Sequence, residues 1–374
     1  MENVRVEICS LVNTEEPRPE AGAVKPDALP KTVPGPGWTA GVLRLLAFFG
    51  VALALAFALD LSIKHGMRSV TTSELGALNQ EMSGRINSEI IISGSSRALC
   101  SYDPQVIHDV TGKTVFNIGQ NATRTDFQLA FLKTYLKHNV KPRILVQNLD
   151  FHTFGLSREN AYPATYAAYL NEGEIYAAFR KVDPGAWKWK YLPLYCFAVE
   201  DDRFTWTLGA ARLFGINPRE RLIRGYAPEY AVMTGEFEVW KQQHPGGETV
   251  DFDPGGVEVL TELMTLCQQN EILVVLVFAP LYNELNPRIL NRDQIFAQFV
   301  RTSGHFKAPF WDYSEAPLTR RKELFSNPLH LNHSGAELFS RDLSERLAAL
   351  IATMDWPGAT NRPVVAGVKP APQP

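Results

Sequence analysis

The sequence predicts an α/β domain built on a parallel sheet that helices cover on both faces. Short and almost wholly apolar runs recur along the chain, as at 89–92, 143–147 and 272–278, and segments with helical periodicity separate them. Strands that are apolar on both faces are typical of parallel sheets, because helices shield both surfaces from water. The chain has 374 residues, which is enough for one large domain or two ordinary ones.

Each predicted strand is an apolar run bounded by polar or turn residues. The strongest is 272–278, with the sequence Ile-Leu-Val-Val-Leu-Val-Phe, and the weakest is 308–311. In chain order, the five strands are expected at 89–92, 115–118, 143–147, 272–278 and 308–311.

Segments with helical periodicity predict the helices between and after these strands. The last helix is the clearest, since Phe339, Leu343, Leu347 and Leu350 recur at helical spacing and must face a core. The helices are expected at about 126–138, near 256–269 and at about 334–351.

Residues 151–254 interrupt this alternation and hold half of the chain's aromatic residues. We interpret them as a helical or irregular insertion after the third strand. The surrounding domain is expected at 87–356, with a linker helix at 63–86 before it and a flexible tail at 357–374 after it. The aromatic residues form either a satellite core or a groove for sugar rings or an acyl chain. The candidates for the groove are Trp187, Trp189, Tyr191, Trp206 and Trp240.

The first apolar segment predicts a membrane-spanning helix at residues 38–62. Residues 45–59 carry no charge, and Arg44 at one end can extend its guanidinium to the lipid headgroups. A helix needs about 20 residues to cross the hydrocarbon core, and the stretch that ends at Asp60 is long enough. The preceding residues 1–37 are rich in Pro and Glu without apolar periodicity, so we expect them to be disordered.

Two other interpretations of this segment are a buried core helix and a cleaved signal peptide, because Ala-Phe-Ala at 56–58 resembles a cleavage site. A signal leader is short and basic, whereas residues 1–37 carry six acidic residues against four Lys and Arg. This favours an uncleaved single-pass anchor in the inner membrane. A small excess of positive charge before the span favours a cytoplasmic N-terminus, with the main domain in the periplasm or exterior.

Charge and cysteine usage exclude several kinds of partner. The formal net charge is −3 at pH 7 without any basic block, so nucleic-acid binding has no support. The four cysteines lack the spacing of a metal site or a disulfide framework, and we interpret them as small buried hydrophobic residues. We expect neither a metal nor a cofactor. The cysteines are Cys9, Cys100, Cys196 and Cys267.

Two short segments carry residues suited to nucleophilic chemistry. Ser96 directly follows the first strand, and functional groups in parallel sheets gather at the carboxyl ends of strands. Its backbone N–H would lie at a helix N-terminus, where it can stabilise an oxyanion. His330 lies just before the last helix, and a serine nucleophile needs a base of this kind.

These segments resemble the SGNH/GDSL hydrolase superfamily. That family has its nucleophile in a Gly-Asp-Ser-like block after the first strand and its histidine in an Asp-x-x-His block before the last helix. Here the blocks are Gly-Ser-Ser-Arg at 94–97 and His-Leu-Asn-His-Ser-Gly-Ala at 330–336, as in divergent membrane-anchored members associated with polysaccharide and teichoic-acid acylation. The second and third blocks match 117–122 and 147–150. The resemblance implies a flavodoxin-like three-layer sheet of order 2-1-3-4-5.

The resemblance makes Ser96 the nucleophile and His330 the base, but the sequence departs from the family pattern. The triad aspartate corresponds to Asn327, and an amide cannot stabilise an imidazolium as a carboxylate does; losing a triad acid can lower the rate about 10⁴-fold. The oxyanion-hole glycine of the second block corresponds to Ala122, with Gly119 as the alternative match.

The third block leaves two assignments open. Its asparagine corresponds to Asn148 or to Asp150, and Asn148 would join the backbone donors of the oxyanion hole. Asp150 would either orient His330 in place of Asn327 or simply cap a loop.

Two functions follow from these expectations. The first is an extracytoplasmic O-acyltransferase or esterase that modifies a cell-envelope or secreted polysaccharide through an acyl-enzyme on Ser96. The resemblance implies a membrane-bound O-acyltransferase as the partner that supplies the acyl group. The second is a catalytically inactive scaffold or polysaccharide-binding subunit of a polymer synthesis or export complex, which the amide at Asn327 favours. The acyl group, the sugar and the direction of transfer do not follow from the sequence.

Overall fold

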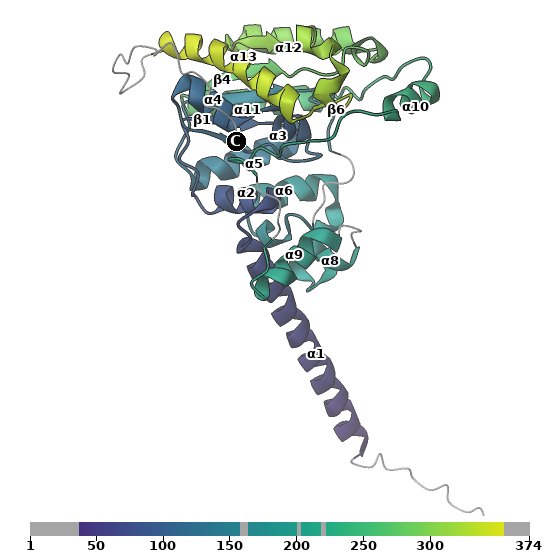
Figure 1. Ribbon diagram of the computed structural model, residues 1–374. Coiled ribbons are helices and arrows are strands. Elements are labelled where there is room, and N and C mark those ends of the chain that lie inside the picture. Colours follow the sequence, from purple (N-terminus) through teal and green to yellow (C-terminus); the bar gives the residue numbers. More distant parts are fainter. Residues whose placement is uncertain (1–36, 158–163, 200–202, 218–221, 355–374) are drawn as a thin grey trace, which may run out of the picture. The chain divides into compact units, whose positions relative to one another are not determined.

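The structure is a computed structural model that describes residues 37–157, 164–199, 203–217 and 222–354 (Figure 1). The expectations for residues 1–36 and for the tail at 357–374 lie outside the described residues. Of the four cysteines, the three in the described part are buried, as predicted: Cys100, Cys196 and Cys267.

The sheet has five parallel strands in the order β2-β1-β3-β4-β5, which confirms the predicted fold class and strand order. The side chains of β1 and β3 are buried along their whole length, because helices cover both faces of the sheet. The strands are β1 (Ile90–Ser93), β2 (Val115–Asn117), β3 (Ile144–Leu149), β4 (Leu273–Phe278) and β5 (Phe310–Asp312).

The helices around the sheet form two groups. Helix α13 packs against α3 and α4, whereas α11 packs against α5 (Figure 1). The strand order reverses between β2 and β3, so right-handed crossovers place the two groups on opposite faces. Their bounds are α3 (Ser96–Ser101), α4 (Pro104–Thr111), α5 (Thr125–His138), α11 (Pro254–Gln269), α12 (Arg292–Phe306) and α13 (His333–Ala352).

A short antiparallel pair, β6 (Phe325–Asn327) and β7 (His330–Leu331), precedes α13 and was not predicted from the sequence. The pair folds back at Pro328 and Leu329, so it forms a tight turn beside the sheet. Single-turn 3-10 helices occur nearby at η3 (Asn286–Arg288), η4 (Pro317–Arg320) and η5 (Lys322–Leu324).

Helix α1 (Gly37–Arg68) is long and apolar enough to cross a membrane by length and composition, with a mean hydropathy of 2.4 in its most apolar window. The helix does not end at Asp60, because the Asp60 carboxylate pairs with Lys64 at 2.8 Å and accepts from the Leu194 N–H at 3.0 Å. The predicted linker helix is therefore divided: its first residues belong to α1, and α2 (Ser73–Met82) follows after a break.

The described part of the insertion is helical and irregular, and most of it forms a second hydrophobic core. Tyr166, Tyr169 and Phe179 are buried there against α2, α5 and the end of α1. Trp189 and Trp206 pack against this core, so they belong to a satellite core and not to a groove. The elements are η1 (Ala167–Tyr169), α6 (Gly173–Val182), η2 (Pro184–Ala186), α7 (Trp187–Tyr191), α8 (Tyr195–Val199), α9 (Arg203–Leu213) and α10 (Glu236–Gln243).

A pair of glycines brings the end of α1 against α9. A Cβ atom on Gly66 would lie 2.0 Å from the carbonyl oxygen of Gly209, so neither helix has room for a larger residue at this crossing. Ile63 and Met67 of α1 are buried on the same side. The last turns of α1 are thus part of the folded domain.

Candidate active site

Ser96 begins α3 directly after the carboxyl end of β1, as predicted. A Cβ atom on Gly94 would lie 2.8 Å from the Cβ atoms of Ala98 and Asn148, so the turn requires glycine there. Ser95 is the N-cap of α3, and its hydroxyl accepts from the Arg97 N–H at 3.4 Å. This turn directs the Ser96 hydroxyl toward the edge of the sheet, where parallel-sheet enzymes hold their reacting groups.

His330 lies on β7, and its Nε2 atom is 2.8 Å from the Ser96 hydroxyl oxygen. The two residues are far apart in the sequence, and the packing of α13 on α3 brings them together. Asn332 fixes the start of α13, since its side-chain oxygen accepts from the Gly335 N–H at 3.1 Å. The structure therefore holds Ser96 and His330 within hydrogen-bonding distance, the arrangement that a serine nucleophile and its base need.

Asn327 lies against the other ring nitrogen of His330. Its side-chain oxygen accepts from the backbone N–H groups of Leu329 at 2.9 Å and His330 at 3.1 Å. The same oxygen lies 3.1 Å from His330 Nδ1, and its amide nitrogen lies 2.9 Å from that atom. An imidazole protonated at Nδ1 donates to this oxygen and leaves Nε2 free to accept the serine proton. Asparagine has this orienting role in Cys-His-Asn sites.

Burial and, to a smaller extent, the positive charge of Arg97 lower the pKa of His330 to about 4, although the negative charge of Asp150 opposes the shift. The imidazole is therefore neutral at pH 7 and can accept a proton. Within the described part of the chain, His330 has no carboxylate as a hydrogen-bond partner. An imidazolium that forms in the reaction is thus stabilised less than in a triad with aspartate.

Asp150 caps a turn and does not orient His330, which corrects the alternative assignment. Its carboxylate accepts from the Ser95 hydroxyl at 2.7 Å and from the His152 N–H at 2.8 Å. Both oxygens are therefore used to hold the turn before Ser96 and the loop after β3.

Arg97 is a site residue that sequence reasoning missed. Its side chain is 3% exposed, and its guanidinium donates to the carbonyls of Leu149, Ala279 and Pro280. It also lies over the ring of Phe278, 4.7 Å from the centroid. Arg97 thus ties the carboxyl ends of β3 and β4 to the nucleophile turn. The signal for this role was an arginine directly after the serine in the Gly-Ser-Ser-Arg block at 94–97.

Ser96 and Ala122 both line the cavity beside the Ser96 hydroxyl, and each carries a backbone N–H group. The N–H of Ser96 lies at the start of α3, where helices leave donors without a partner. Ala122 lines the same cavity, and no backbone acceptor takes its N–H in the described part of the chain. The φ angle of Ala122 is +54°, a conformation that favours glycine, the residue of the family block. The alternative match Gly119 is unsuitable, because its N–H already donates to Asn117 at 2.9 Å.

Asn148 is not at the cavity. It is buried on β3, its side-chain oxygen accepts from the Tyr102 hydroxyl at 2.8 Å, and it does not line the space beside Ser96. Its amide nitrogen has no hydrogen-bond partner in the described part of the chain. The structure thus brings Ser96, His330, Asn327 and Ala122 together, whereas Asn148 does not line the cavity.

The cavity beside Ser96 has a volume of about 200 Å³. Thr123, Arg124 and His152 give its wall hydrogen-bonding groups, while Phe151 and Leu329 make it apolar on the other side. Among the described residues, no group of three or more His, Cys, Asp and Glu could hold a metal ion. The site thus offers a nucleophile, a base and backbone donors.

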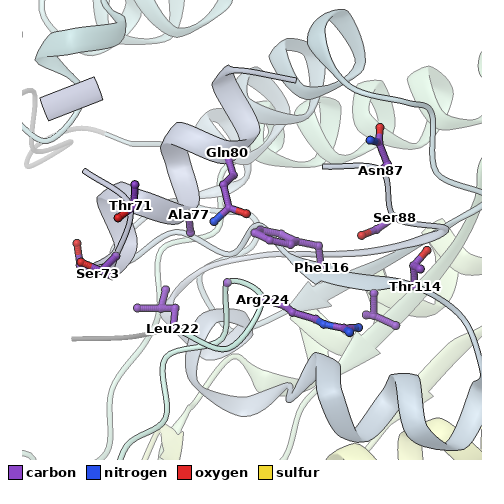
Figure 2. Close-up of a pocket in the computed structure, with 13 residues that line it drawn as sticks. Thr71, Ser73, Ala77, Gln80, Asn87, Ser88, Thr114, Phe116, Leu222 and Arg224 are labelled. Atoms are coloured by element: carbon purple, nitrogen blue, oxygen red, sulfur yellow. The ribbon is translucent and has the colours of Figure 1, made fainter. Parts of the chain in front are cut away.

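A larger cavity of about 460 Å³ lies away from this site, and Figure 2 shows the side chains around it. Its wall includes Ser88 and Thr114, which precede β1 and β2, together with Gln80, Phe116 and Arg224. Ser96 follows β1, so this cavity and Ser96 lie at opposite edges of the parallel sheet. It is therefore not part of the Ser96 site.

No family model matches the chain, and no curated protein matches its sequence. Several solved structures do match. The chain is similar to a protein described as an acylhydrolase from Bacteroides fragilis (9% identity, 69% of this chain and 87% of that one, TM-score 0.34). It is also similar to a protein described as a lipolytic member of the G-D-S-L family from Desulfitobacterium hafniense (10% identity, 69% and 98%, TM-score 0.33). A third match is an inhibitor-bound aryl esterase from M. smegmatis (11% identity, 70% and 98%, TM-score 0.32).

At this level of similarity nothing about the activity of this chain follows from the matches. The chain's own strand order, with Ser96 after β1 and His330 just before α13, is the arrangement that the sequence resemblance implied. The fold is a parallel α/β sheet domain with the strand order that this resemblance implied. Activity has to be argued from the side chains themselves.

Proposed function

We propose that the chain is a serine-dependent O-acyltransferase or esterase that acts outside the cytoplasm on a cell-envelope or secreted polysaccharide. The observation that carries the proposal is the 2.8 Å contact between the Ser96 hydroxyl and His330 Nε2. This contact lies beside a cavity that Ala122 also lines, and among the described residues no backbone acceptor takes the Ala122 N–H. Nucleophile, base and oxyanion donors are the parts that acyl transfer needs.

In the first step, the Ser96 oxygen forms a bond to the acyl carbon of the donor while its proton passes to His330 Nε2. The N–H groups of Ser96 and Ala122 hold the oxyanion of the tetrahedral intermediate. When the intermediate collapses, the donor's leaving oxygen takes the proton from His330, and the acyl group stays on Ser96. A sugar hydroxyl, or water in hydrolysis, then gives its proton to His330 and bonds to the acyl carbon. The bond between Ser96 and the acyl carbon breaks, and the Ser96 oxygen takes the proton back from His330.

The polar part of the cavity wall suits the sugar that would accept the acyl group. Thr123, Arg124 and His152 line it and present hydrogen-bonding groups next to the Ser96 hydroxyl. By resemblance, a membrane-bound O-acyltransferase would supply the acyl group.

Helix α1 supports the proposed location, because it is long and apolar enough to serve as an anchor. With a cytoplasmic N-terminus, a reporter enzyme that is active only outside the cytoplasm should be active when fused after residue 70. The same reporter fused at residue 30 should be silent. The opposite pattern would refute the orientation and the proposed compartment of the substrate.

A non-catalytic scaffold is the second candidate, and the amide of Asn327 in place of a carboxylate is the observation that favours it. Replacing Ser96 with alanine separates the two functions. The enzyme requires Ser96 for acylation of the polysaccharide in cells, whereas the scaffold requires only a folded domain.

A further inference from the structure

We propose that an apolar pocket beside His330 binds the hydrocarbon chain of the acyl group, so that the donor carries an acyl chain longer than acetyl. This inference rests on the proposed function and names its donor class. The pocket has a volume of about 420 Å³, within the usual range of small-molecule sites. Its apolar wall consists of Phe151, Phe237, Trp240, Val250, Leu285 and Ile289.

The pocket is adjacent to the space beside Ser96. Phe151, His152, Leu329 and His330 line both cavities, so a ligand can extend from one into the other. Leu329 stands between them and is 37% exposed. An acyl carbon held at the Ser96 hydroxyl therefore lies at the entrance to the apolar pocket, and its chain can continue into the pocket.

The walls of the pocket favour hydrocarbon over a sugar. Phe237, Val250, Leu285 and Ile289 are all less than 9% exposed, so a chain that enters the pocket is removed from water. The exposed carboxylates of Glu236 and Glu248 lie at the pocket and disfavour an anionic sugar there by like-charge repulsion.

Trp240 offers no free ring face for a sugar to stack on. Its ring is nearly parallel to that of Phe237, at 19° and 5.7 Å, and to that of His244, at 20° and 4.7 Å. Phe237 and His244 are one helical turn before and after Trp240, so they cover its two faces. Only the edge of the indole remains for the pocket, and an apolar edge suits methylene groups.

Helix α10, which carries Phe237 and Trp240, belongs to the insertion, whereas Leu285 and Ile289 come from the segment after β4. The acyl pocket is therefore an addition to the sheet domain. It would set which donor the Ser96 site accepts without altering the Ser96–His330 pair.

Phosphonate probes of different chain length test this assignment. In ethyl p-nitrophenyl alkylphosphonates, the Ser96 oxygen bonds to phosphorus, p-nitrophenolate leaves with the bonding electron pair, and His330 takes the serine proton. The alkyl group on phosphorus takes the place of the acyl chain. Each buried methylene favours reaction about fourfold, so the octyl probe should label Ser96 at least about tenfold faster than the methyl probe.

Two variants and a control refine the test. Leu329→Trp narrows the passage and should lower the octyl-to-methyl ratio of labelling rates about tenfold. Trp240→Ala widens the pocket and should shift the preferred chain from octyl toward dodecyl. Val300→Trp introduces the same side chain at a residue of α12 that is 58% exposed and lines neither cavity, so it should leave the ratio unchanged. Thermal melting checks that each variant is folded.

The outcomes separate this inference from the proposed function. An octyl-to-methyl ratio of labelling rates near one in the wild type, with Ser96 labelled by both probes, would refute the acyl pocket. It would not contradict the serine mechanism. Absence of Ser96 labelling with every probe would overturn the proposed function and this inference together. A ratio of about ten or more that falls in Leu329→Trp and not in Val300→Trp supports the pocket.

Discussion

Cells that carry Ser96→Ala are expected to make polysaccharide without the acyl groups that depend on this protein. The variant lacks the oxygen that forms the acyl-enzyme in the proposed mechanism, and losing a nucleophile of this kind lowers the rate by about 10³-fold or more. The fold should persist, because the Ser96 hydroxyl bonds only to His330 among the described residues, and one such bond contributes about 1 kcal/mol. The measurement is the acyl content of purified polysaccharide, with protein abundance checked in the same cells.

A matched control is Ser303→Ala on α12, which also removes one side-chain hydrogen bond, to the carbonyl of Ala308 at 2.7 Å. This variant lies outside the site and should leave acylation at the wild-type level. If Ser96→Ala cells also show wild-type acylation at normal protein abundance, the enzyme function is refuted and the scaffold is the better account.

Asn327→Asp is expected to change the pH dependence of ester hydrolysis. The base must be neutral to accept the serine proton, so activity falls as the pH drops through the pKa of His330, which is about 4 in the wild type. A carboxylate at position 327 raises that pKa, because it stabilises the imidazolium. The acid limb of kcat/KM should therefore move from about pH 4 toward the ordinary histidine value of about 6.5.

The same substitution should raise the rate at pH 8 about tenfold or more, since it restores the acid that stabilises the charged imidazole in the transition state. The aspartate retains an oxygen for the N–H groups of Leu329 and His330, so the turn should keep its shape. Rates of p-nitrophenyl acetate hydrolysis between pH 3 and 8 give both quantities. An acid limb that stays near pH 4 in the variant would show that His330 is not the titrating base.

The sheet and the Ser96–His330 pair could be predicted from the sequence because both leave local signals. Apolar runs such as 272–278 identify buried strands without any tertiary information. Ser96 and His330 each stand at a junction between elements, and the strand order of a parallel sheet then places both junctions at one edge.

Other features depend on contacts that no local pattern encodes. Helix α1 continues to Arg68 because the Asp60 carboxylate pairs with Lys64 and accepts a hydrogen bond from the Leu194 N–H. Leu194 is distant from Asp60 in the sequence, so no local pattern predicts this contact. The sequence left two roles open for Asp150, to orient His330 or to cap a loop. Its hydrogen bonds with the Ser95 hydroxyl and the His152 N–H show the second role.

The roles of the individual aromatic residues in the insertion could not be predicted from the sequence either. Its aromatic content predicted a satellite core or a groove, and the structure has both: Trp189 and Trp206 pack against the second core, whereas Trp240 lines the pocket beside His330. A double substitution of Trp189 and Trp206 would therefore destabilise the domain and would not specifically test polysaccharide binding. The choice among the aromatics depends on tertiary packing, which composition does not record.

The most direct test of the central claim is covalent trapping of the purified, full-length protein with ethyl p-nitrophenyl methylphosphonate, followed by intact-mass measurement and peptide mapping. An activated Ser96 should take up one phosphonate in the wild type, at a rate that drops about 10²-fold or more in His330→Gln. Labelling of another residue, or a rate at Ser96 that does not depend on His330, would contradict a Ser96–His330 catalytic pair.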